Sequence, residues 1–247
     1  MTPERRARYL DALGIPCWVP RQGNAGETGS GVAPPSPSEG PASRQGTFPA
    51  GIETGPGGLG WDALEARVAA CTLCGLHQTR SRTVFGVGDR EATWMVVGEA
   101  PGAEEDRQGE PFVGRAGKLL NAMLAAIGLE RRQVYIANIL KCRPPENRDP
   151  RPEEAACCEP YLRRQVELVR PRVILALGRI AAHHLLGTTT SLARLRGQTH
   201  RYGVTDIPVV VTYHPAYLLR SPGEKRKAWV DLLYARNVCA RGDPVRV

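Results

Sequence analysis

From residue 94 onward, the chain alternates between short continuous runs of apolar residues and longer segments whose apolar residues recur at helical spacing. A short apolar run is typical of a buried strand, and a longer periodic segment is typical of an amphipathic helix. The predicted strands are residues 94–97, 133–140, 172–177 and 208–212. The predicted helices are residues 116–129, 152–169, 179–186 and 224–239.

The order of these elements predicts the fold class. Strands rich in Val, Ile and Leu are separated by helices, and this pattern favours a parallel sheet that is covered on both faces. We therefore expect an α/β fold, a three-layer α/β/α sandwich around a central, mostly parallel four-stranded sheet.

The first 60 residues have a different pattern. Residues 1–20 predict a short amphipathic helix that ends near a Gly-Ile-Pro sequence. In residues 21–60, 17 of the 40 positions are Gly or Pro, and such a stretch buries too little apolar surface to offset the entropy of ordering it. The sequence therefore predicts a short helical segment, a disordered or loosely draped linker over 21–60, and one folded domain over 61–247.

The net charge of +8 and the pI near 9.4 favour a polyanionic partner such as nucleic acid. An Arg-rich proteome would give the same excess, so the charge alone leaves the partner open. The first ten residues lack the apolar core of a signal peptide, and the apolar runs are too short to cross a bilayer. We expect a cytoplasmic protein without a membrane partner, in which the seven cysteines are metal ligands or buried thiols rather than disulfides.

Four of the cysteines have the spacing of a metal centre. Cys71 and Cys74 form a C-x-x-C pair, which holds two thiolates close enough to ligate one metal. Cys142 and Cys158 are distant in sequence, so the fold would have to bring them to this pair. Thiolate ligands suit zinc and iron–sulfur clusters equally well, and the spacing does not choose between them.

Polar residues follow three of the predicted strands. Glu99 lies directly after the first strand, Asn138 near the end of the second, and His214 after the fourth. In open parallel sheets, ligands bind at the carboxyl ends of the strands. Each residue alone is more typical of a turn or a structural role, but their joint placement predicts a binding site.

Four motifs carry a resemblance to a known family: GEAPG at 98–102, EEDRQGEPFVGRAGKLLN at 104–121, ANILKCRPPENRDP at 137–150 and HPAYLLR at 214–220. The chain resembles the uracil-DNA glycosylase superfamily, and within it the iron–sulfur enzymes of family 4, over about residues 64–239. The resemblance implies excision of uracil from single- or double-stranded DNA by a monomeric DNA-repair enzyme.

The resemblance also implies a [4Fe-4S] cluster held by Cys71, Cys74, Cys142 and Cys158, with a structural rather than a redox role. Cys157 competes with Cys158, but it would face about 100° away on a helix, and the family spacing selects Cys158. The two remaining cysteines, Cys17 and Cys239, are expected to be small apolar residues.

The family pattern assigns roles at the strand ends. Phe112 resembles the ring that stacks on the flipped base, unless it is only a core aromatic. Asn138 resembles the amide that reads the uracil edge, and His214 the donor that stabilises charge on uracil O2. The expected catalytic residues are Glu99 and His214, and the expected substrate-binding residues are Gly98, Ala100, Phe112 and Asn138.

Ala100 departs from the pattern of the related family 1 enzymes, which have an aspartate that orients water at this position. Family 4 shares the apolar residue, so activity is expected with a different water-activating group. Glu99 is the first candidate, followed by Glu105 and Asp106. Gly102 replaces the tyrosine that excludes thymine in family 1, and Glu105 is the candidate for that role.

Several loop residues are candidates for contact with DNA. Arg143, Arg148 and Arg151 flank the cysteines and are expected to bind phosphates, unless they form only a solvated basic face. Tyr217 and Leu218 are candidates to fill the gap left by the flipped base, and Arg220 follows them.

Two alternative functions remain open from the sequence. One is a glycosylase for other deaminated bases, or a relative that bonds covalently to the abasic sugar; Ala100 and the direct Thr212-Tyr213-His214 sequence argue against the covalent branch. The other is a non-catalytic DNA-binding relative, which the presence of Asn138 and His214 disfavours.

Overall fold

The structure is a computed structural model that describes residues 56–241, apart from the side chain of Val204. The predicted segment 1–20, with Cys17, and most of the predicted linker 21–60 lie outside the described residues. The helices are α2 (Trp61–Ala69), α3 (Ala103–Gln108), α4 (Arg115–Ala126), α5 (Pro152–Val169), α6 (Gly178–Leu186), α7 (Leu192–Leu195), α8 (Pro215–Arg220) and α9 (Lys225–Arg241). The strands are β1 (Val87–Gly88), β2 (Trp94–Gly98), β3 (Tyr135–Asn138), β4 (Val173–Leu177), β5 (Thr199–Tyr202) and β6 (Ile207–Thr212).

The strands form one six-stranded sheet in the order β1-β3-β2-β4-β6-β5, so the prediction of four strands is corrected. The four predicted strands are the inner ones, and they run parallel. The additional strands β1 and β5 lie at the edges and pair antiparallel. β1 has only two residues and β5 is polar and partly exposed, so neither shows the continuous apolar run that identifies a buried strand.

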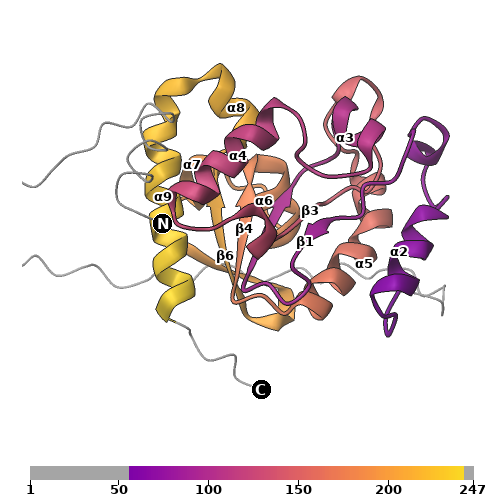
Figure 1. Ribbon diagram of the computed structural model, residues 1–247, viewed down its shortest axis with the longest axis horizontal. Helices are drawn as coiled ribbons and strands as arrows, with labels where there is room; N and C mark the ends of the chain where they lie inside the picture. The colour runs from indigo at the N-terminus through magenta and orange to yellow at the C-terminus, as the bar shows by residue number, and fades with distance from the viewer. Residues whose placement is uncertain (1–55, 242–247) are drawn as a thin grey trace, which may run out of the picture. The chain divides into compact units, whose positions relative to one another are not determined.

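Helices cover both faces of the sheet (Figure 1). Successive residues of a strand point to opposite faces, and the strand residues accordingly divide between two hydrophobic clusters. Met95 and Val97 of β2 pack in one cluster with α5 and α6, whereas Trp94 and Val96 pack in the other with α4 and α9. The α/β class and the layered arrangement are confirmed in the part of the chain that the structure describes.

Helix α2 packs against α5 at one edge of the domain (Figure 1). Leu64 and Val68 of α2 form a small cluster with Tyr161 of α5, and Arg164 Nε donates a hydrogen bond of 2.8 Å to the carbonyl of Leu59. These contacts attach the segment that leads into Cys71 to the helix that carries the second cysteine region.

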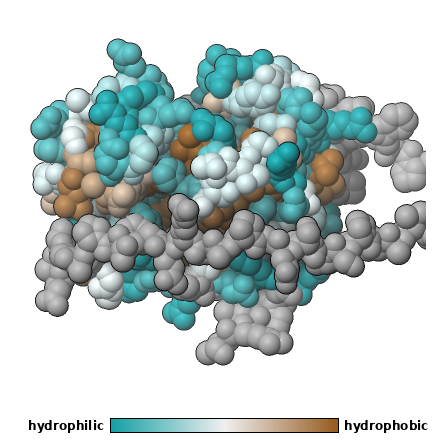
Figure 2. All heavy atoms as spheres, turned by 180° about the vertical axis from the view of Figure 1, so that it is seen from behind, coloured by the Kyte–Doolittle hydropathy of each residue, from teal (hydrophilic) through white to brown (hydrophobic). Residues whose placement is uncertain are grey.

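None of the helices within residues 56–241 is both long and apolar enough to cross a membrane. Hydrophilic residues cover much of the face seen in Figure 2. Large hydrophobic side chains are exposed at Leu73, Tyr217 and Val230. Of these three, Tyr217 belongs to the residues that the sequence places at the binding site.

Candidate active site

The carboxyl ends of the parallel strands open into a cavity of about 460 Å³. β2 ends at Gly98, β3 ends at Asn138, and β6 leads into His214. Gly98 and Asn138 are direct partners in the sheet register. The predicted site residues that line the cavity are Glu99, Ala100, Gly102, Glu105, Phe112, Asn138, Arg148, His214, Tyr217 and Arg220. The predicted convergence of the three strand ends is therefore confirmed.

Asn138 carries a buried amide oxygen without a partner. Asn138 is 2% exposed, and its Oδ1 has no hydrogen-bond partner among the described residues. Leaving a buried polar atom unpaired costs about 1–3 kcal/mol, and nearly all such atoms in proteins are paired. An unpaired acceptor that lines a cavity is therefore expected to meet a hydrogen-bond donor on a ligand.

Gly98 leaves room for the two side chains that form the floor of the cavity. A Cβ atom at this position would lie 2.4 Å from Asn138 Oδ1 and 2.6 Å from Cζ of Phe112, distances that real Cβ atoms do not reach. Glycine at 98 thus permits both side chains to approach the backbone. This contact gives Gly98 a packing reason for its place in the site.

Phe112 lies in both the hydrophobic core and the wall of the cavity. It is 6% exposed, its backbone has a φ of 55°, and its ring centroid lies 5.6 Å from that of His214. A positive φ is uncommon for an aromatic residue and costs of the order of 1 kcal/mol or more. The loop is closely packed, because a Cβ at Gly117 would lie 1.8 Å from the Phe112 carbonyl oxygen.

His214 is held in one tautomer. Its Nδ1 accepts a hydrogen bond of 3.1 Å from the backbone N–H of Ala216, so the ring proton lies on Nε2. Burial, with a smaller contribution from the nearby Arg220, lowers the pKa of His214 to about 4 against the opposing effect of Glu105. The imidazole is therefore neutral at pH 7 and presents an Nε2–H donor.

Glu99 is a half-buried carboxyl group at the end of β2. Within residues 56–241 its carboxylate makes no hydrogen bond or ion pair. Burial, with a smaller contribution from Asp149, raises the pKa of Glu99 to about 7 against the opposing effect of Arg179. A group with this pKa exchanges a proton near neutral pH, as a general base requires.

The two other acid candidates have structural partners. Glu105 Oε1 accepts from the backbone N–H groups of Val113 at 3.0 Å and Gly114 at 3.1 Å. Asp106 is 3% exposed, and both of its oxygens accept from the N–H of Ser81 at 3.0 Å. These carboxylates hold backbone loops, which leaves Glu99 as the first candidate for activating water.

The structure contradicts one predicted DNA contact. Leu218 is 1% exposed and packs in the core beside α4 and α9, so its side chain is not available to fill a gap in a duplex. Adjacent residues of a helix point in different directions, and on α8 the neighbouring Tyr217 is the one that faces outward, at 37% exposed. Tyr217 and Arg220 both line the cavity.

Three of the predicted DNA-contact arginines also make hydrogen bonds within the protein. Arg148 Nη1 donates to Glu154 at 2.9 Å, and a second bond joins the same two groups. Arg143 Nε donates to Asn147 Oδ1 at 2.8 Å. The backbone N–H of Arg151 donates to Glu154 at 2.9 Å, at the start of α5. Their contact with DNA stays a prediction.

The fold brings the four predicted ligand cysteines into one region. Cys142 and Cys158 are 4% and 3% exposed and lie in one hydrophobic cluster, against which Cys74 packs. Burial raises the pKa of Cys142, and the charges of Cys74 and Cys71 raise it as well. Burial, together with the charges of Cys142 and Cys74, raises the pKa of Cys158 to about 12 against the opposing effect of Lys141.

Within residues 56–241, no group of three or more His, Cys, Asp or Glu side chains has the geometry of a metal site. The donor set nevertheless fits a thiolate-bound group. The partly buried Cys71 and Cys74 lie close enough to raise the pKa of the buried Cys142, and Cys142 and Cys74 raise that of the buried Cys158. Arg80 Nη1 also donates to Cys142 Sγ at 3.1 Å. The neighbouring Cys157 also lies beside the 71–74 segment: its Sγ donates to the carbonyl of Leu73 at 3.4 Å, and burial together with the charges of Cys74 and Cys71 raises its pKa.

The sequence interpretation missed three residues that shape the site. Gly178 has a φ of +87°, and a Cβ there would lie 2.9 Å from the Cβ of His214. Its signal was a glycine placed directly after the apolar run 172–177. Asp149 and Arg179, which both act on Glu99, form an ion pair of 2.9 Å between the loop before α5 and the first turn of α6. No local pattern indicates that pair.

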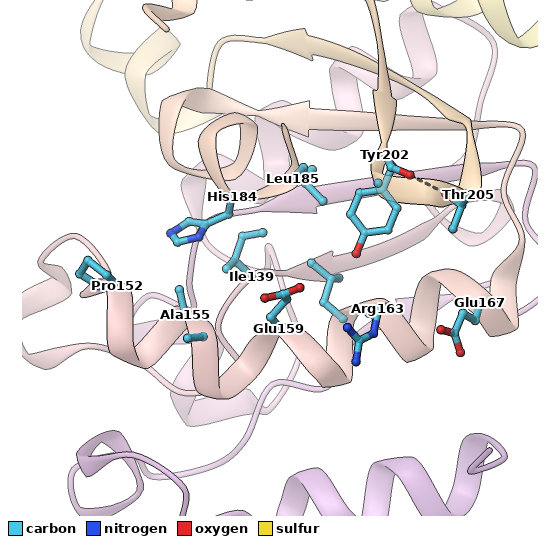
Figure 3. Close-up of a pocket in the computed structure, with 13 residues that line it drawn as sticks. Ile139, Pro152, Ala155, Glu159, Arg163, Glu167, His184, Leu185, Tyr202 and Thr205 are labelled. Carbon is cyan, nitrogen blue, oxygen red and sulfur yellow. Dashed lines mark hydrogen bonds between the residues drawn. The ribbon is translucent and has the colours of Figure 1, made fainter. Parts of the chain in front are cut away.

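A second cavity, of about 420 Å³, lies between α5 and the region from α6 to β5. In Figure 3, Glu159 and Arg163 extend from α5 on one side, and His184 and Tyr202 lie on the other. None of the predicted site residues lines this cavity, and none of the unpartnered buried polar atoms of residues 56–241 belongs to it. The two volumes are similar, so the chemistry of the lining identifies the strand-end cavity as the functional one.

The model of the uracil DNA glycosylase superfamily matches residues 85–236, which include Glu99, Phe112, Asn138 and His214. The chain is 44% identical over 190 residues to the type-4 uracil-DNA glycosylase of Archaeoglobus fulgidus, covering 74% of this chain and 95% of that protein. It is 42% identical over 172 residues to the type-4 enzyme of Sulfurisphaera tokodaii, covering 67% and 78%. It is 44% identical over 161 residues to that of Thermotoga maritima, covering 65% and 83%. The chain belongs to the uracil DNA glycosylase superfamily.

Proposed function

We propose that this protein excises uracil from DNA by hydrolysing the N-glycosidic bond of a flipped nucleotide, leaving an abasic site. The observation that carries the proposal is the unpaired Oδ1 of Asn138 in the strand-end cavity, beside a neutral His214. The proposal is also supported by the names of its relatives, which are type-4 uracil-DNA glycosylases.

Recognition of uracil depends on both polar atoms of the Asn138 side-chain amide, the acceptor Oδ1 and the donor Nδ2. Uracil presents an N3–H donor beside its O4 acceptor, so Asn138 Oδ1 accepts from N3–H while Nδ2 donates to O4. Cytosine reverses both polarities and would leave buried groups unpaired, at a cost of about 1–3 kcal/mol. Phe112 packs against the face of the base. A base inside a duplex is out of reach of this cavity, so the nucleotide must leave the stack first.

Cleavage transfers an electron pair to the base. As the bond between uracil N1 and the sugar C1′ breaks, negative charge develops on the base, and His214 Nε2–H donates a hydrogen bond to O2. A fixed donor in a desolvated cavity stabilises such charge more than water does. A water oxygen then bonds to C1′, its proton passes to Glu99, and the released uracil anion takes a proton from solvent.

The role of Glu99 predicts a specific dependence on pH. Glu99 accepts a proton only when it is ionised, so the single-turnover rate is expected to rise as pH increases through about 7 and then to level off. Glu99→Gln is expected to be slow and to lose this rise. A Glu99→Gln protein with the rate and pH profile of the wild type would show that Glu99 is not the base.

The test of the proposed function is a glycosylase assay. The purified protein is incubated with a labelled oligonucleotide that contains one uracil, and alkali then cleaves any abasic site. We expect cleavage with uracil and none with thymine or cytosine at the same position. Cleavage only with another deaminated base would favour the alternative of a glycosylase for such bases. Binding of DNA without cleavage would favour the non-catalytic DNA-binding relative.

We also propose a [4Fe-4S] cluster on Cys71, Cys74, Cys142 and Cys158. Four thiolates are the usual ligand set of such a cluster, and its binding would offset the cost of ionising the buried Cys142 and Cys158. When bound, the cluster would join the 71–74 segment to the loop after β3, which carries Cys142, and to α5, which carries Cys158; this is a structural role. Lys141 lies in this region and is 1% exposed, with Nζ donating to the carbonyl of Asn138 at 2.9 Å.

Two neighbouring cysteines provide a matched test of the cluster. Cys158→Ser is expected to lose iron and visible absorption, because it removes a buried ligand. Cys157→Ser changes the same atom one position earlier and is expected to keep both. Iron content and absorption spectra of the two purified proteins check this prediction. Zinc in the wild type, or equal iron in both variants, would contradict it.

Binding of DNA through its phosphates, by Arg143, Arg148, Arg151 and Arg220, predicts an affinity that falls steeply with salt concentration. The monomeric state and the cytoplasmic location also stay predictions.

A further inference from the structure

Tyr217 is an aromatic side chain in the open at the mouth of the proposed uracil cavity. It is one of three large hydrophobic side chains exposed in the described part of the chain, and it lines the cavity together with His214. A solvent-exposed aromatic ring leaves apolar surface in contact with water, and it is free to change rotamer unless neighbouring residues hold it in place. In the structure, another aromatic residue holds the Tyr217 ring.

The ring of Tyr217 stacks on the ring of Tyr213. The two centroids are 5.1 Å apart and the planes differ by 25°. Tyr213 is the residue directly before His214, and it is partly buried against the hydrophobic cluster that contains α4 and α9. The exposed ring therefore rests on a ring that is itself anchored in the core.

Tyr213 is held in turn by Arg196. The guanidinium carbon lies 4.3 Å from the centroid of the Tyr213 ring, and Nη1 donates to the Tyr213 hydroxyl at 3.3 Å. A cation over an aromatic face attracts the ring, and the hydrogen bond fixes its orientation. Arg196 thus contacts both the face and the edge of Tyr213.

The guanidinium of Arg196 has little freedom to move. Its Nε and Nη2 donate to the two carboxylate oxygens of Asp231 on α9, at 2.7 and 3.1 Å. Thr212, the last residue of β6, donates to the same carboxylate at 2.8 Å. The side chains of Arg196 and Asp231 are 13% and 2% exposed. A bidentate pair of this kind fixes geometry as well as charge.

We propose that Arg196 and Tyr213 are positioning residues that hold Tyr217 in place as the ring that fills the gap in the duplex when uracil flips out. The inference rests on the proposed function. Arg196, Tyr213 and Tyr217 form one stack that begins at a buried ion pair and ends at the cavity mouth. A ring that is already fixed loses little conformational entropy when a base stacks on it, so the stack favours the flipped state.

A flipped nucleotide leaves a gap only in a duplex, so the effect should depend on the substrate. Tyr213→Leu removes the stacking surface, and we expect the single-turnover rate on duplex DNA to fall about tenfold relative to the rate on single-stranded DNA. Tyr213→Phe keeps the ring and loses the hydroxyl, and its ratio of the two rates is expected to stay within about twofold of the wild type. The rate on single strands reports a folded site in each variant.

A double-mutant cycle separates positioning from a general loss of stability. If Tyr213 acts through Tyr217, adding Tyr213→Leu to Tyr217→Ala should not change the duplex to single-strand ratio further. A second readout does not depend on cleavage of the N-glycosidic bond. The base analogue 2-aminopurine, placed next to the uracil, becomes more fluorescent when it is unstacked. The fluorescence change on binding of the wild type to duplex DNA is expected to decrease in Tyr213→Leu.

Arg196→Lys keeps a cation for Asp231 but loses the planar group that stacks on Tyr213. Its ratio is expected to change in the same direction as that of Tyr213→Leu, and an unchanged ratio would remove Arg196 from the proposal. Equal losses on both substrates in Tyr213→Leu, or a full further loss in the double mutant, would overturn the role of Tyr213. A wild type that releases no uracil from either substrate would instead contradict the proposed function.

Discussion

Replacing His214 with alanine is expected to lower the single-turnover rate of uracil release by about 100- to 1,000-fold, the usual effect of removing one donor from a charge-stabilising site. The Nε2–H of His214 is the donor that the fold fixes, since Nδ1 is already bonded to the N–H of Ala216. The affinity for uracil-containing DNA should change much less, because the charge on O2 develops only as the bond breaks.

The neutral charge state of His214 also predicts how the rate depends on pH. Its pKa of about 4 lies below that of free histidine, so the ring stays neutral as pH falls from about 9 to 5 and is protonated only below that range. The rate should therefore show no titration of His214 in this range, and nitrogen NMR should show the Nε2–H tautomer at pH 7. His184, which lines the second cavity, is the matched control, and His184→Ala should keep the wild-type rate. An imidazolium signal for His214 at pH 7 would contradict this mechanism.

Replacing Asn138 with alanine is expected to lower kcat/KM for uracil excision by at least about 100-fold, because a site built to hydrogen-bond its substrate loses both partners at once. Oδ1 has no partner among the described residues, so its removal should cost little stability. We expect the free energy of unfolding of Asn138→Ala to stay within about 1 kcal/mol of the wild type. Single-turnover kinetics and denaturant unfolding on the same preparation measure both quantities.

Asn121 supplies the control for this substitution. It lies exposed on α4, where its Oδ1 accepts a hydrogen bond of 3.4 Å from Arg131. Asn121→Ala should leave the rate of excision unchanged. If Asn138→Ala released uracil at the wild-type rate, the amide would not read the base, and the main support for the proposed function would be lost.

The four inner strands and four of the helices, α4, α5, α6 and α9, could be predicted from local patterns. Their predicted ends lie within three residues of the observed ones, because a strand that is buried on both faces must be apolar throughout. The edge strands β1 and β5 could not be predicted in this way. An edge strand has one solvated side, so its residues carry no continuous apolar signal.

Leu218 shows where a motif is insufficient. Within HPAYLLR, residues 217 and 218 are equally plausible as an exposed apolar contact, and the sequence does not state which way α8 is turned. That orientation depends on how α8 packs against α4 and the core, which buries Leu218 and exposes Tyr217. The same packing creates the stack of Arg196, Tyr213 and Tyr217 from three separate positions of the chain.

The sequence by itself determined the α/β class, the residues at the strand ends, the cysteine pattern and the resemblance to the family. These features depend on local periodicity, on the rule that parallel strands end at one rim, and on the order of the motifs. Only the tertiary structure decided that Asn138 has an unpaired oxygen, that His214 is neutral and held by Ala216, and that the pKa of Glu99 is about 7. Such properties depend on desolvation and on neighbours that are distant in the chain, and a linear sequence states neither burial nor distance.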